Sequence, residues 1–301
     1  MLKLDVTIAV INWNTKELLA ACLNSLFKAQ PLVGFEVRVI DNHSTDGSVQ
    51  LVERDFPQVD IVENAGNLGF AAAANQALRQ SSARYVFILN SDTEIEQDTI
   101  DILVDFADSH ERAAVVGPAL FNADGSTQIT GRNFPSFSDS IMHAFLGVLW
   151  HNNPWSVRYK MLDWDRRSER SVDWVSGAAM FVRREAAQEV NFFDENFFMY
   201  VEDLDFCYRL RQKNWQVYFY PQAKAMHHIG KSSEQTSNKM IVEFQKSMYR
   251  FYNKKYQHSW RRFLKPLVVV GLGLRIILLI SISYFRRVSA GMRPKPSKKE
   301  V

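Results

Sequence analysis

Polar residues that could bind a ligand follow three apolar, strand-like runs in the first part of the chain, at residues 12–15, 41–48 and 90–92. A carboxylate in such a place commonly forms an Asx turn or caps the next helix. A carboxylate that projects from the carboxyl edge of a sheet can also hold a divalent cation, because Mg²⁺ is bound by one or two carboxylates together with substrate phosphates. Residue type and position therefore leave both interpretations open for Asp41 and Asp92.

Two further groups of titratable residues lie in the second half of the chain. Glu202, Asp203 and Asp205 open a segment with a helical pattern, and carboxylates suit the positive end of a helix dipole. His227 and His228 follow another strand-like run. A lone histidine in that position is more often structural than a ligand, so the pattern alone assigns it no role.

The elements that must position these residues alternate between strand and helix patterns. The predicted elements are strands at 6–11, 36–40, 60–63 and 85–89 and helices at 18–27 and 71–78. This alternation is typical of an α/β fold with a mostly parallel sheet and right-handed crossovers. Ligands bind beyond the carboxyl ends of the strands in such sheets, so function is expected where the three polar clusters lie.

The second half is less regular. A loop-rich stretch at 122–138 precedes an aromatic-rich region at 150–164, whose elements the pattern does not define. Residues 172–183 predict one strand that contains a glycine, residues 184–190 a helix, and residues 217–220 a further strand.

The composition is that of a globular protein with a sizeable core. Of the 301 residues, 47% are hydrophobic and 23% charged, which excludes a disordered or fibrous chain. Cys22 and Cys207 are too few for a disulfide framework, and Met1 leads into an apolar run without a basic region or a cleavage site. These features predict a cytosolic chain.

Charge is distributed unevenly along the chain. Residues 244–299 contain 14 Lys or Arg and no Asp or Glu, whereas the whole chain has 36 basic and 33 acidic residues. The rest of the chain therefore carries a net charge of about −11. An anionic partner surface is expected to meet the basic C-terminal segment.

Taken together, the motifs resemble the family-2 glycosyltransferases, and within them the bacterial rhamnosyltransferase-like enzymes that build surface polysaccharides. The resemblance covers about residues 5–232. It rests on residues 12–14, 22–26, 39–48, 64–70 with Asn75, 89–92, 177–180, 193–195, 202–209 and 227–232.

The resemblance implies a GT-A fold, which is a Rossmann-like, mostly parallel sheet flanked by helices, and a nucleotide-diphosphate sugar as the donor. Asp41 would read the nucleobase, because a carboxylate can accept the imide N–H of uracil or thymine. The implied donor-binding residues are Asn14, Asp41, Ser44, Asp46, Asn67, Gly69, Asn75, Asn90 and Asp92.

The resemblance also implies a metal-dependent, inverting reaction. Asp92 matches the metal-binding aspartate of the family's Asp-x-Asp-like motif, and His227 is a further ligand for Mg²⁺ or Mn²⁺, which neutralises the departing diphosphate. Asp203 matches the general base that deprotonates the acceptor hydroxyl, with Glu202 and Asp205 in support. Crowded carboxylates can raise the pKa of one of them toward the working range.

Two positions depart from the family pattern. Asn90 stands where the first aspartate of the metal motif is usual, which leaves fewer negative charges for the cation. Asn191 and Phe192 replace a glycine pair that relatives usually carry, so a differently shaped turn is expected on the acceptor side.

The motifs divide the chain into two expected domains. Residues 1–235 would form the catalytic domain, with a nucleotide-sugar-binding half at 1–117 and an acceptor and base half at 118–235. Residues 236–301 would form a basic helical extension.

The extension contains an apolar segment at 266–285 that would reach roughly 30 Å as a helix, about the thickness of one hydrocarbon core. Arg275 lies near its middle, where insertion costs about 2.5–3.5 kcal/mol, and both flanks are basic. The preferred interpretation is a helix in the inner-leaflet interface, with the basic residues of 261–299 on anionic headgroups. A single span and a buried helix that packs on the catalytic domain or a dimer mate are the alternatives.

The sequence thus predicts an inverting, metal-dependent glycosyltransferase that binds peripherally at the cytoplasmic face of the cell membrane. It would move rhamnose from dTDP-rhamnose, or a sugar from a UDP-sugar, to a polyprenyl-linked or cell-surface glycan acceptor. Nucleic acid is not expected as a partner, because no nucleic-acid-binding fold is recognisable.

Other protein classes fit less well. A sugar nucleotidyltransferase would show a Gly-rich phosphate loop after Ile11, and a non-catalytic glycan-binding protein would be expected to lack Asp92 and Asp203. A dinucleotide-dependent oxidoreductase is disfavoured because no G-x-G-x-x-G motif follows the first strand.

Overall fold

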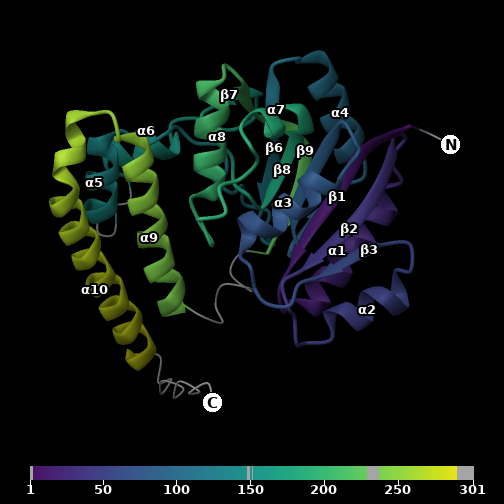
Figure 1. Cartoon of the computed structure of the whole chain (residues 1–301), viewed down its shortest axis with the longest axis horizontal. Helices are drawn as coiled ribbons and strands as arrows, with labels where there is room; N and C mark the ends of the chain where they lie inside the picture. Colours follow the sequence, from purple (N-terminus) through teal and green to yellow (C-terminus); the bar gives the residue numbers. More distant parts are fainter. Residues whose placement is uncertain (1–2, 148–149, 151, 229–236, 290–301) are drawn as a thin grey trace. The chain divides into compact units, whose positions relative to one another are not determined.

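The computed structural model describes residues 3–147, 150, 152–228 and 237–289, which belong to two units, Met1–Gln235 and Thr236–Val301. The first unit is built on a nine-stranded sheet in the order β3-β2-β1-β4-β8-β6-β9-β5, with β7 beside β9 (Figure 1).

The first half of this unit consists of strand and helix in alternation, as the sequence predicts. Its elements are β1 (Leu4–Asn12), α1 (Lys16–Ala29), β2 (Gly34–Asp41), α2 (Ser48–Asp55), β3 (Asp60–Glu63), α3 (Phe70–Gln80) and β4 (Tyr85–Asn90). All four strands are parallel to their neighbours within this half.

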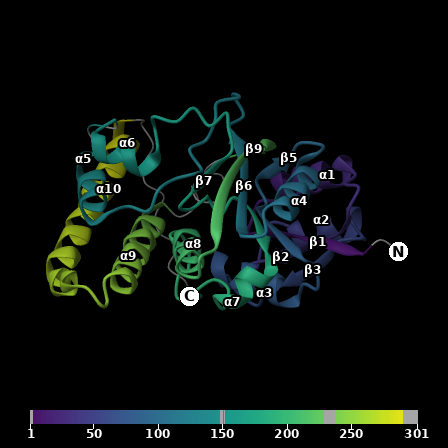
Figure 2. The ribbon, with the colours of Figure 1, turned by 90° about the horizontal axis from the view of Figure 1, so that it is seen from above.

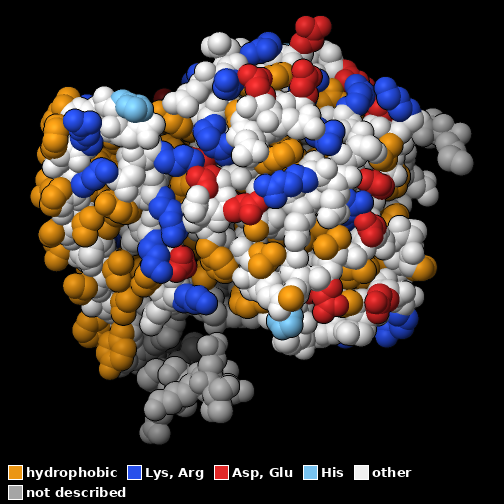
Figure 3. Space-filling model, viewed as in Figure 1, with side chains coloured by type: hydrophobic (Ala, Val, Ile, Leu, Met, Phe, Trp, Pro, Cys, Tyr) orange, Lys and Arg blue, Asp and Glu red, His pale blue; other side chains and the backbone are white. Residues whose placement is uncertain are grey.

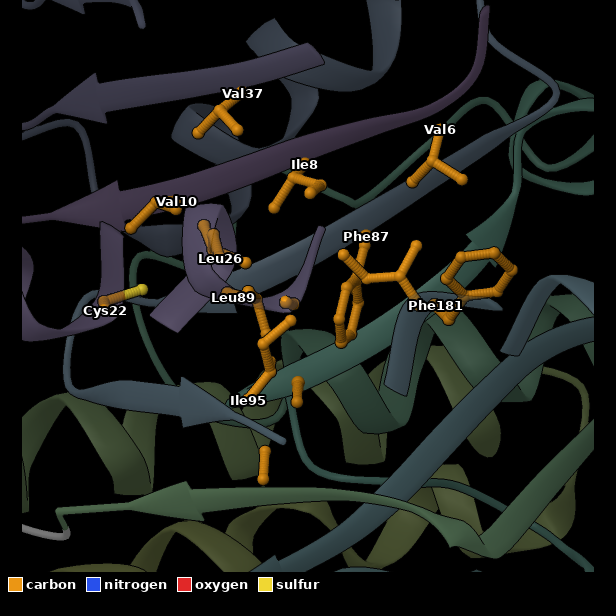
Figure 4. Close-up of a cluster of buried hydrophobic side chains, with 14 of the residues drawn as sticks. Val6, Ile8, Val10, Cys22, Leu26, Val37, Phe87, Leu89, Ile95 and Phe181 are labelled. Carbon is orange, nitrogen blue, oxygen red and sulfur yellow. The ribbon is translucent and has the colours of Figure 1, made fainter. Parts of the chain in front are cut away.

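The core lies between these strands and the helices that cover them. Alternate residues of β1, Val6, Ile8 and Val10, face the apolar side of α1, where Leu26 and Cys22 are fully buried (Figure 4). Each fully buried side chain of this kind stabilises the fold by roughly 1.5–3 kcal/mol. In Figure 2, α1 and α4 (Thr99–Ser109) lie on one side of the strands and α3 and α7 (Arg184–Glu189) on the other.

The second half adds strands of both directions to the same sheet. Its remaining elements are β5 (Thr93–Ile95), β6 (Ala113–Phe121), α5 (Phe137–Leu146), α6 (Pro154–Lys160), β7 (Arg170–Val172), β8 (Ala179–Arg183), α8 (Glu202–Gln212) and β9 (Gln216–His227). β8 lies between β4 and β6 and is antiparallel to both. The sheet is therefore mixed, and it is mostly parallel only in its first half.

The prediction of one strand over 172–183 is wrong. Val172 ends β7, which pairs with β9, whereas β8 begins at Ala179, beside β4. The chain leaves one part of the sheet and enters another within these residues, which a local apolar pattern does not reveal. The proposed division at residue 117 also falls inside β6, so the two halves share a sheet.

The second unit contains α9 (Ser237–Lys255), the short 3₁₀ helix η2 (Trp260–Leu264) and α10 (Lys265–Ser289), and α9 packs along α10 (Figure 1). Trp260–Phe285 is long and apolar enough to cross a membrane, and no other segment of the described residues is. Hydrophobic side chains gather on the surface of α10 (Figure 3). Its exposed large apolar residues include Leu267, Val270, Leu274, Ile277 and Phe285.

Candidate functional site

The predicted polar clusters meet at one edge of the sheet. In the sheet register Asn12 pairs with Asp41, and Ile11 pairs with Asn90. β6 and β9 run in the same direction as β4, so β9 reaches the same edge at His227. β8 starts at this edge, where Ala179 pairs with Leu89.

Asp41 is fully buried and holds the turn after β2. Its Oδ1 accepts hydrogen bonds from Asn12 Nδ2 (2.7 Å) and Ser44 Oγ (2.6 Å), and its Oδ2 accepts one from the Ser44 N–H (2.7 Å). A carboxylate has about four lone-pair sites, so one remains on Oδ2. Asp41 is thus a turn former, as the structural interpretation predicts, with one lone pair of Oδ2 left without a donor among the described residues.

Asn14, Ser44 and Asp46 connect the two loops that follow β1 and β2. Ser44 Oγ accepts a hydrogen bond from the Asn14 N–H (2.8 Å). Asp46 accepts hydrogen bonds from the Lys16 N–H (2.8 Å) and from the N–H and hydroxyl of Ser48, which lie at the starts of α1 and α2. A carboxylate there satisfies backbone donors that lack helical partners.

The loop before α3 approaches the second half of the unit at Gly69. Asn67 Oδ1 accepts a hydrogen bond from the Gly69 N–H (3.0 Å), and Gly69 has a φ of +84°. A Cβ at this position would lie 2.1 Å from the carbonyl oxygen of Phe198, which accepts the Phe70 N–H at 3.0 Å. Only glycine allows this close approach of two backbones.

Asn75 differs from the other predicted donor-binding residues in lying within a helix. It is fully buried in α3, where Nδ2 donates to the Phe193 carbonyl (3.0 Å) and Glu195 Oε1 (2.8 Å), and Oδ1 accepts the Phe193 N–H (2.9 Å). These contacts engage both polar atoms of its side chain, so Asn75 ties α3 to the loop before α8, and its role in donor binding stays a prediction.

Asp92 and His227 are brought together by the pairing of β5 with β9. Thr93 lies opposite His227, and the Asp92 carbonyl accepts the His228 N–H (2.9 Å). His227 Nε2 lies 3.2 Å from Asp92 Oδ1, and both side chains are largely buried. Beside this pair, His228 Nε2 lies 2.9 Å from Glu94 Oε1.

Gln128 orients the His227 ring. Its Nε2 donates to the His227 carbonyl (2.8 Å), so its Oε1 faces His227 Nδ1 at 2.9 Å. Since Oε1 can only accept, this pattern assigns a proton to Nδ1 of the neutral ring, and Nε2 then carries the lone pair on the side of Asp92.

These atoms fit a divalent cation that is shared with a substrate. Asp92 Oδ1 is buried and accepts no hydrogen bond from the described residues. Among the same residues no group of three or more His, Cys, Asp and Glu side chains is placed to hold a metal ion. Mg²⁺ is usually bound by one or two carboxylates, with substrate phosphates and water completing its coordination, so Asp92 could serve as the carboxylate and His227 as a neighbouring ligand.

Gly177 and Ala178 connect this edge to the start of α8. The Gly177 N–H donates to Asp203 Oδ2 (3.0 Å), and the Ala178 carbonyl accepts the Asn90 N–H (3.0 Å). Two consecutive residues thereby hold the candidate metal motif and the candidate base at a fixed separation.

The start of α8 presents two adjacent carboxyl groups with raised pKa values. Burial raises the pKa of Glu202 well above its ordinary value, and the neighbouring Asp203 charge adds to the effect. Burial also raises the pKa of Asp203, although N–H donors from Gly177 and Leu204 favour its ionised form. Glu202 Oε2 has no hydrogen-bond partner among the described residues.

Asp205 has a different role from these two residues. It is fully buried, and its Oδ2 accepts a hydrogen bond from Arg209 Nε at 2.8 Å, one helical turn along α8. Arg209 also donates to the Val190 carbonyl (2.5 Å). The pair anchors α8, and the supporting role of Asp205 in catalysis stays a prediction.

Comparison with known proteins assigns the chain to a family. Residues 7–190 match glycosyl transferase family 2. The chain is 33% identical to N-acetylglucosaminyl-diphospho-decaprenol L-rhamnosyltransferase of Mycobacterium tuberculosis, over 83% of this chain and 85% of the relative. The chain belongs to glycosyl transferase family 2.

Other similar proteins agree with this assignment. The glycosyltransferase is 28% identical to rhamnosyltransferase WbbL of Escherichia coli, over 64% of this chain and 70% of the relative. Its fold is similar to that of GalNAc-T7, solved with UDP, GalNAc and Mn²⁺, at a TM-score of 0.56 and 15% identity over 76% of this chain and 44% of the other. It is also similar to the fold of residues 1–349 of Staphylococcus aureus TarS, at a TM-score of 0.52 and 18% identity. That match covers 86% of this chain and 73% of the TarS chain.

Family membership confirms the predicted α/β, GT-A class and the prediction of an enzyme. It decides against the nucleotidyltransferase, oxidoreductase and non-catalytic alternatives.

Sequence reasoning assigned no site role to two residues that position the site of the glycosyltransferase, Gln128 and Asn12. Gln128 lies in the loop-rich stretch, where no periodic pattern marks it, and its contact with His227 is long-range. Asn12 holds Asp41, and its position at the end of the first strand was a usable signal. Residues 229–232 of the motif that begins at His227 lie outside the described residues.

Proposed function

We propose that this glycosyltransferase moves rhamnose from dTDP-rhamnose, or a sugar from a UDP-sugar, to a polyprenyl-linked or cell-surface glycan acceptor with inversion of configuration. The observation that carries the proposal is the pair of hydrogen bonds made by the adjacent residues Gly177 and Ala178. Gly177 binds Asp203, and Ala178 binds Asn90 of the motif that contains Asp92, so the candidate base and the candidate metal motif lie on either side of one short segment. The relative that acts on N-acetylglucosaminyl-diphospho-decaprenol supports the sugar and acceptor classes.

Asp41 is proposed to recognise the nucleobase. Its remaining acceptor position suits the imide N–H of uracil or thymine, whereas adenine and cytosine lack such a group. The buried contacts with Asn12 and Ser44 keep the carboxylate in one orientation before the donor binds.

Asp92 and His227 would hold Mg²⁺ or Mn²⁺ beside the donor diphosphate. When bound there, the cation supplies charge neutralisation for the leaving nucleotide diphosphate. The residues of this chain prepare the site: Gln128 fixes the ring of His227, and Asp92 keeps one oxygen without a hydrogen bond within the described residues.

Asp203 is proposed to remove the proton from the acceptor hydroxyl as that oxygen attacks the anomeric carbon. A general base works best when its pKa lies near the operating pH, and burial moves the pKa of Asp203 upward in that direction. Attack from the side opposite the leaving diphosphate, in one displacement, inverts the configuration of the sugar.

The second unit is proposed to bind the cytoplasmic face of the cell membrane through α10 and the basic residues of 261–299, of which 290–299 lie outside the described residues. Arg275 on α10 donates to Gln245 Oε1 of α9 (3.3 Å), so this arginine has a partner within the protein. Lys246 and Glu243 form an ion pair next to Gln245. If α10 crossed the bilayer with α9 packed against it, these charges would enter the hydrocarbon, which favours an interfacial position.

The test of the reaction is a panel of nucleotide sugars with purified protein, a diphosphate-linked GlcNAc acceptor, and Mg²⁺ or Mn²⁺. We expect release of dTDP or UDP from one donor, loss of turnover in excess chelator, and an inverted linkage in the product. Turnover that is unchanged in chelator would remove the role of the cation.

Asp92→Ala should weaken metal-dependent nucleotide binding, and the remote exposed variant Glu111→Ala serves as its control.

A further inference from the structure

Three basic residues lie close together in the segment between β6 and β7, and one of them, Arg132, lies near the candidate base. Arg166 donates through Nη2 to the carbonyl oxygens of Lys160 (2.7 Å) and Gly131 (3.4 Å), and the Asn133 N–H donates to the Tyr159 carbonyl (3.1 Å). These contacts pack the segment around Arg132 against the segment 159–166. We refer to Arg132, Lys160 and Arg166 as the cation cluster.

The cation cluster has no anionic partner within the described residues. None of its three members forms an ion pair there, although Arg158 next to them pairs with Asp139. Burial, followed by the charge of Arg132, lowers the pKa of Lys160 and also that of Arg166. The exposed Asp163 acts on Arg166 in the opposite direction but makes no ion pair in the described part of the chain.

Buried donors without acceptors lie in the same segments. Arg166 is only 8% exposed, and its Nε has no hydrogen-bond partner in the described residues. The same holds for Trp164 Nε1 and Thr130 Oγ1. A buried donor without a partner is destabilising, so these segments carry donors whose hydrogen bonds are unmet within the described residues.

The cation cluster lies on the acceptor side of the site. Arg132 exchanges backbone hydrogen bonds with Trp174 (3.0 and 3.1 Å), three residues before Gly177, whose N–H donates to Asp203 Oδ2 (3.0 Å). The positive charge of Arg132 also opposes the rise in the pKa of that carboxyl. Asp92 and His227, which face the proposed donor diphosphate, are held by different residues. An anion on the cation cluster would therefore belong to the molecule whose hydroxyl Asp203 deprotonates.

We infer that Arg132, Lys160 and Arg166 bind the diphosphate that links the acceptor sugar to its lipid. This inference rests on the proposed function, because it names the part of the acceptor that the site recognises. Guanidinium groups suit phosphate oxygens through paired donors, and a lysine adds a compact charge. One pyranose ring would then separate the cation cluster from the hydroxyl at Asp203.

Lys160→Gln is the first test, because the Lys160 side chain makes no hydrogen bond or ion pair in the described residues and can be changed with little effect on folding. Arg167→Gln is the matched control, since that exposed arginine is nearby in sequence and contacts only Asp165 at 3.9 Å. Equal thermal unfolding of both variants and the parent protein establishes that the fold is intact.

Binding is measured first, without turnover. Inorganic pyrophosphate and a short-chain prenyl diphosphate are titrated into the full chain with Mg²⁺ and saturating UDP or dTDP, which occupies the donor site. Loss of one charge-assisted contact should weaken prenyl diphosphate binding about ten- to hundredfold in Lys160→Gln and leave Arg167→Gln unchanged. Because no sugar is transferred, this binding measurement tests the inference even if the proposed donor sugar is wrong.

Steady-state kinetics distinguish the diphosphate of the acceptor from the diphosphate of the nucleotide-sugar donor. Lys160→Gln should raise the KM for a diphosphate-linked GlcNAc acceptor by about the same factor as it weakens prenyl diphosphate binding. The KM for the donor and the KM for a neutral alkyl glycoside of GlcNAc should not change. Equal weakening of UDP binding would assign the cation cluster to the donor and overturn the inference. Unchanged binding of prenyl diphosphate would overturn it as well.

Discussion

At the scale of single residues, Glu202 and Asp203 illustrate how adjacent carboxyl groups acquire different roles. Burial raises the pKa of both. Asp203 receives N–H donors from Gly177 and Leu204 that stabilise its charge, whereas Glu202 Oε2 has no partner within the described residues. Asp203 is therefore the one that can ionise first and act as a base.

Asp203→Asn tests this assignment. The amide keeps the size of the side chain but cannot take up the proton, so turnover should fall by about 10²–10⁴-fold while donor binding stays the same. Release of nucleotide diphosphate under saturating substrates is the measurement. A fall of less than tenfold, with intact donor binding, would move the role to Glu202.

Glu202→Gln should change the pH dependence of stability. A folded-state pKa that is raised means that the native protein binds more protons, so the wild type loses stability as pH rises above about 4.3, by up to about 1.4 kcal/mol per pH unit. Glutamine does not titrate. The difference in unfolding free energy between variant and wild type should therefore grow in favour of the variant from about pH 4.5 upward.

Urea unfolding at several pH values measures this difference, and Glu111→Gln, an exposed glutamate outside the site, is the control. A difference that is flat with pH would contradict the burial of a protonated Glu202.

At the scale of elements, backbone strain concentrates in the segment that leads to α8. Asn191 and Phe192 have φ values of 56° and 61°, and Tyr200 and Val201 have values of 65° and 71°. The first pair stands where the family resemblance implies a glycine pair, and its backbone adopts the left-handed region that glycine prefers. Such residues cost of order 1–3 kcal/mol each and cluster at sites where geometry matters more than stability.

Gly69→Ala tests the contact between this segment and the loop before α3. The backbone conformation at Gly69 strongly favours glycine, and the new Cβ would meet the Phe198 carbonyl oxygen at 2.1 Å. Strain and overpacking should lower the unfolding free energy by about 2–4 kcal/mol and weaken donor binding.

Gly66→Ala is the matched control in the same loop, because a Cβ there would contact nothing within 4 Å. It should be neutral or slightly stabilising in the same denaturation series. Equal effects of the two substitutions would show that the close approach at Gly69 is unimportant.

At the scale of the whole molecule, the distribution of charge and apolar surface separates catalysis from attachment. The residues assigned to chemistry lie in the first unit, and the basic segment 244–299 and the exposed apolar residues of α10 lie in the second. Substitutions in the second unit should therefore change membrane binding and leave sugar transfer by the first unit unaffected.

Membrane binding is predicted to have an electrostatic and an apolar part. Raising the salt concentration until the Debye length falls from ~10 Å to ~3 Å should release much of the protein from anionic vesicles. The double variant Leu267→Gln and Ile277→Gln, at two side chains that are each 64% exposed, should lower vesicle partitioning by at least about tenfold, or about 1.4 kcal/mol.

Leu32→Gln is the control, because Leu32 is 84% exposed but lies in the first unit. Co-sedimentation with vesicles measures both effects. Retention through high salt and carbonate washing would instead favour a spanning α10.

The sequence alone determined the alternation of strand and helix in the first half, the polar clusters at the strand ends, and the family. These features depend on local patterns: β-branched runs, helical spacing, and carboxylates that directly follow a strand. Asp41, Asp92 and Asp203 could be named as candidates for that reason, since each lies at the boundary of a regular element.

Only the tertiary structure decided which distant segments meet. The position of β8 between β4 and β6, the engagement of Asn75 with Phe193, and the contact of Gln128 with His227 join residues far apart in sequence. The cation cluster likewise comes from loops without periodicity. A local pattern reports that a face is buried but not what covers it, because pairing and packing partners are selected by the complementarity of the whole folded chain.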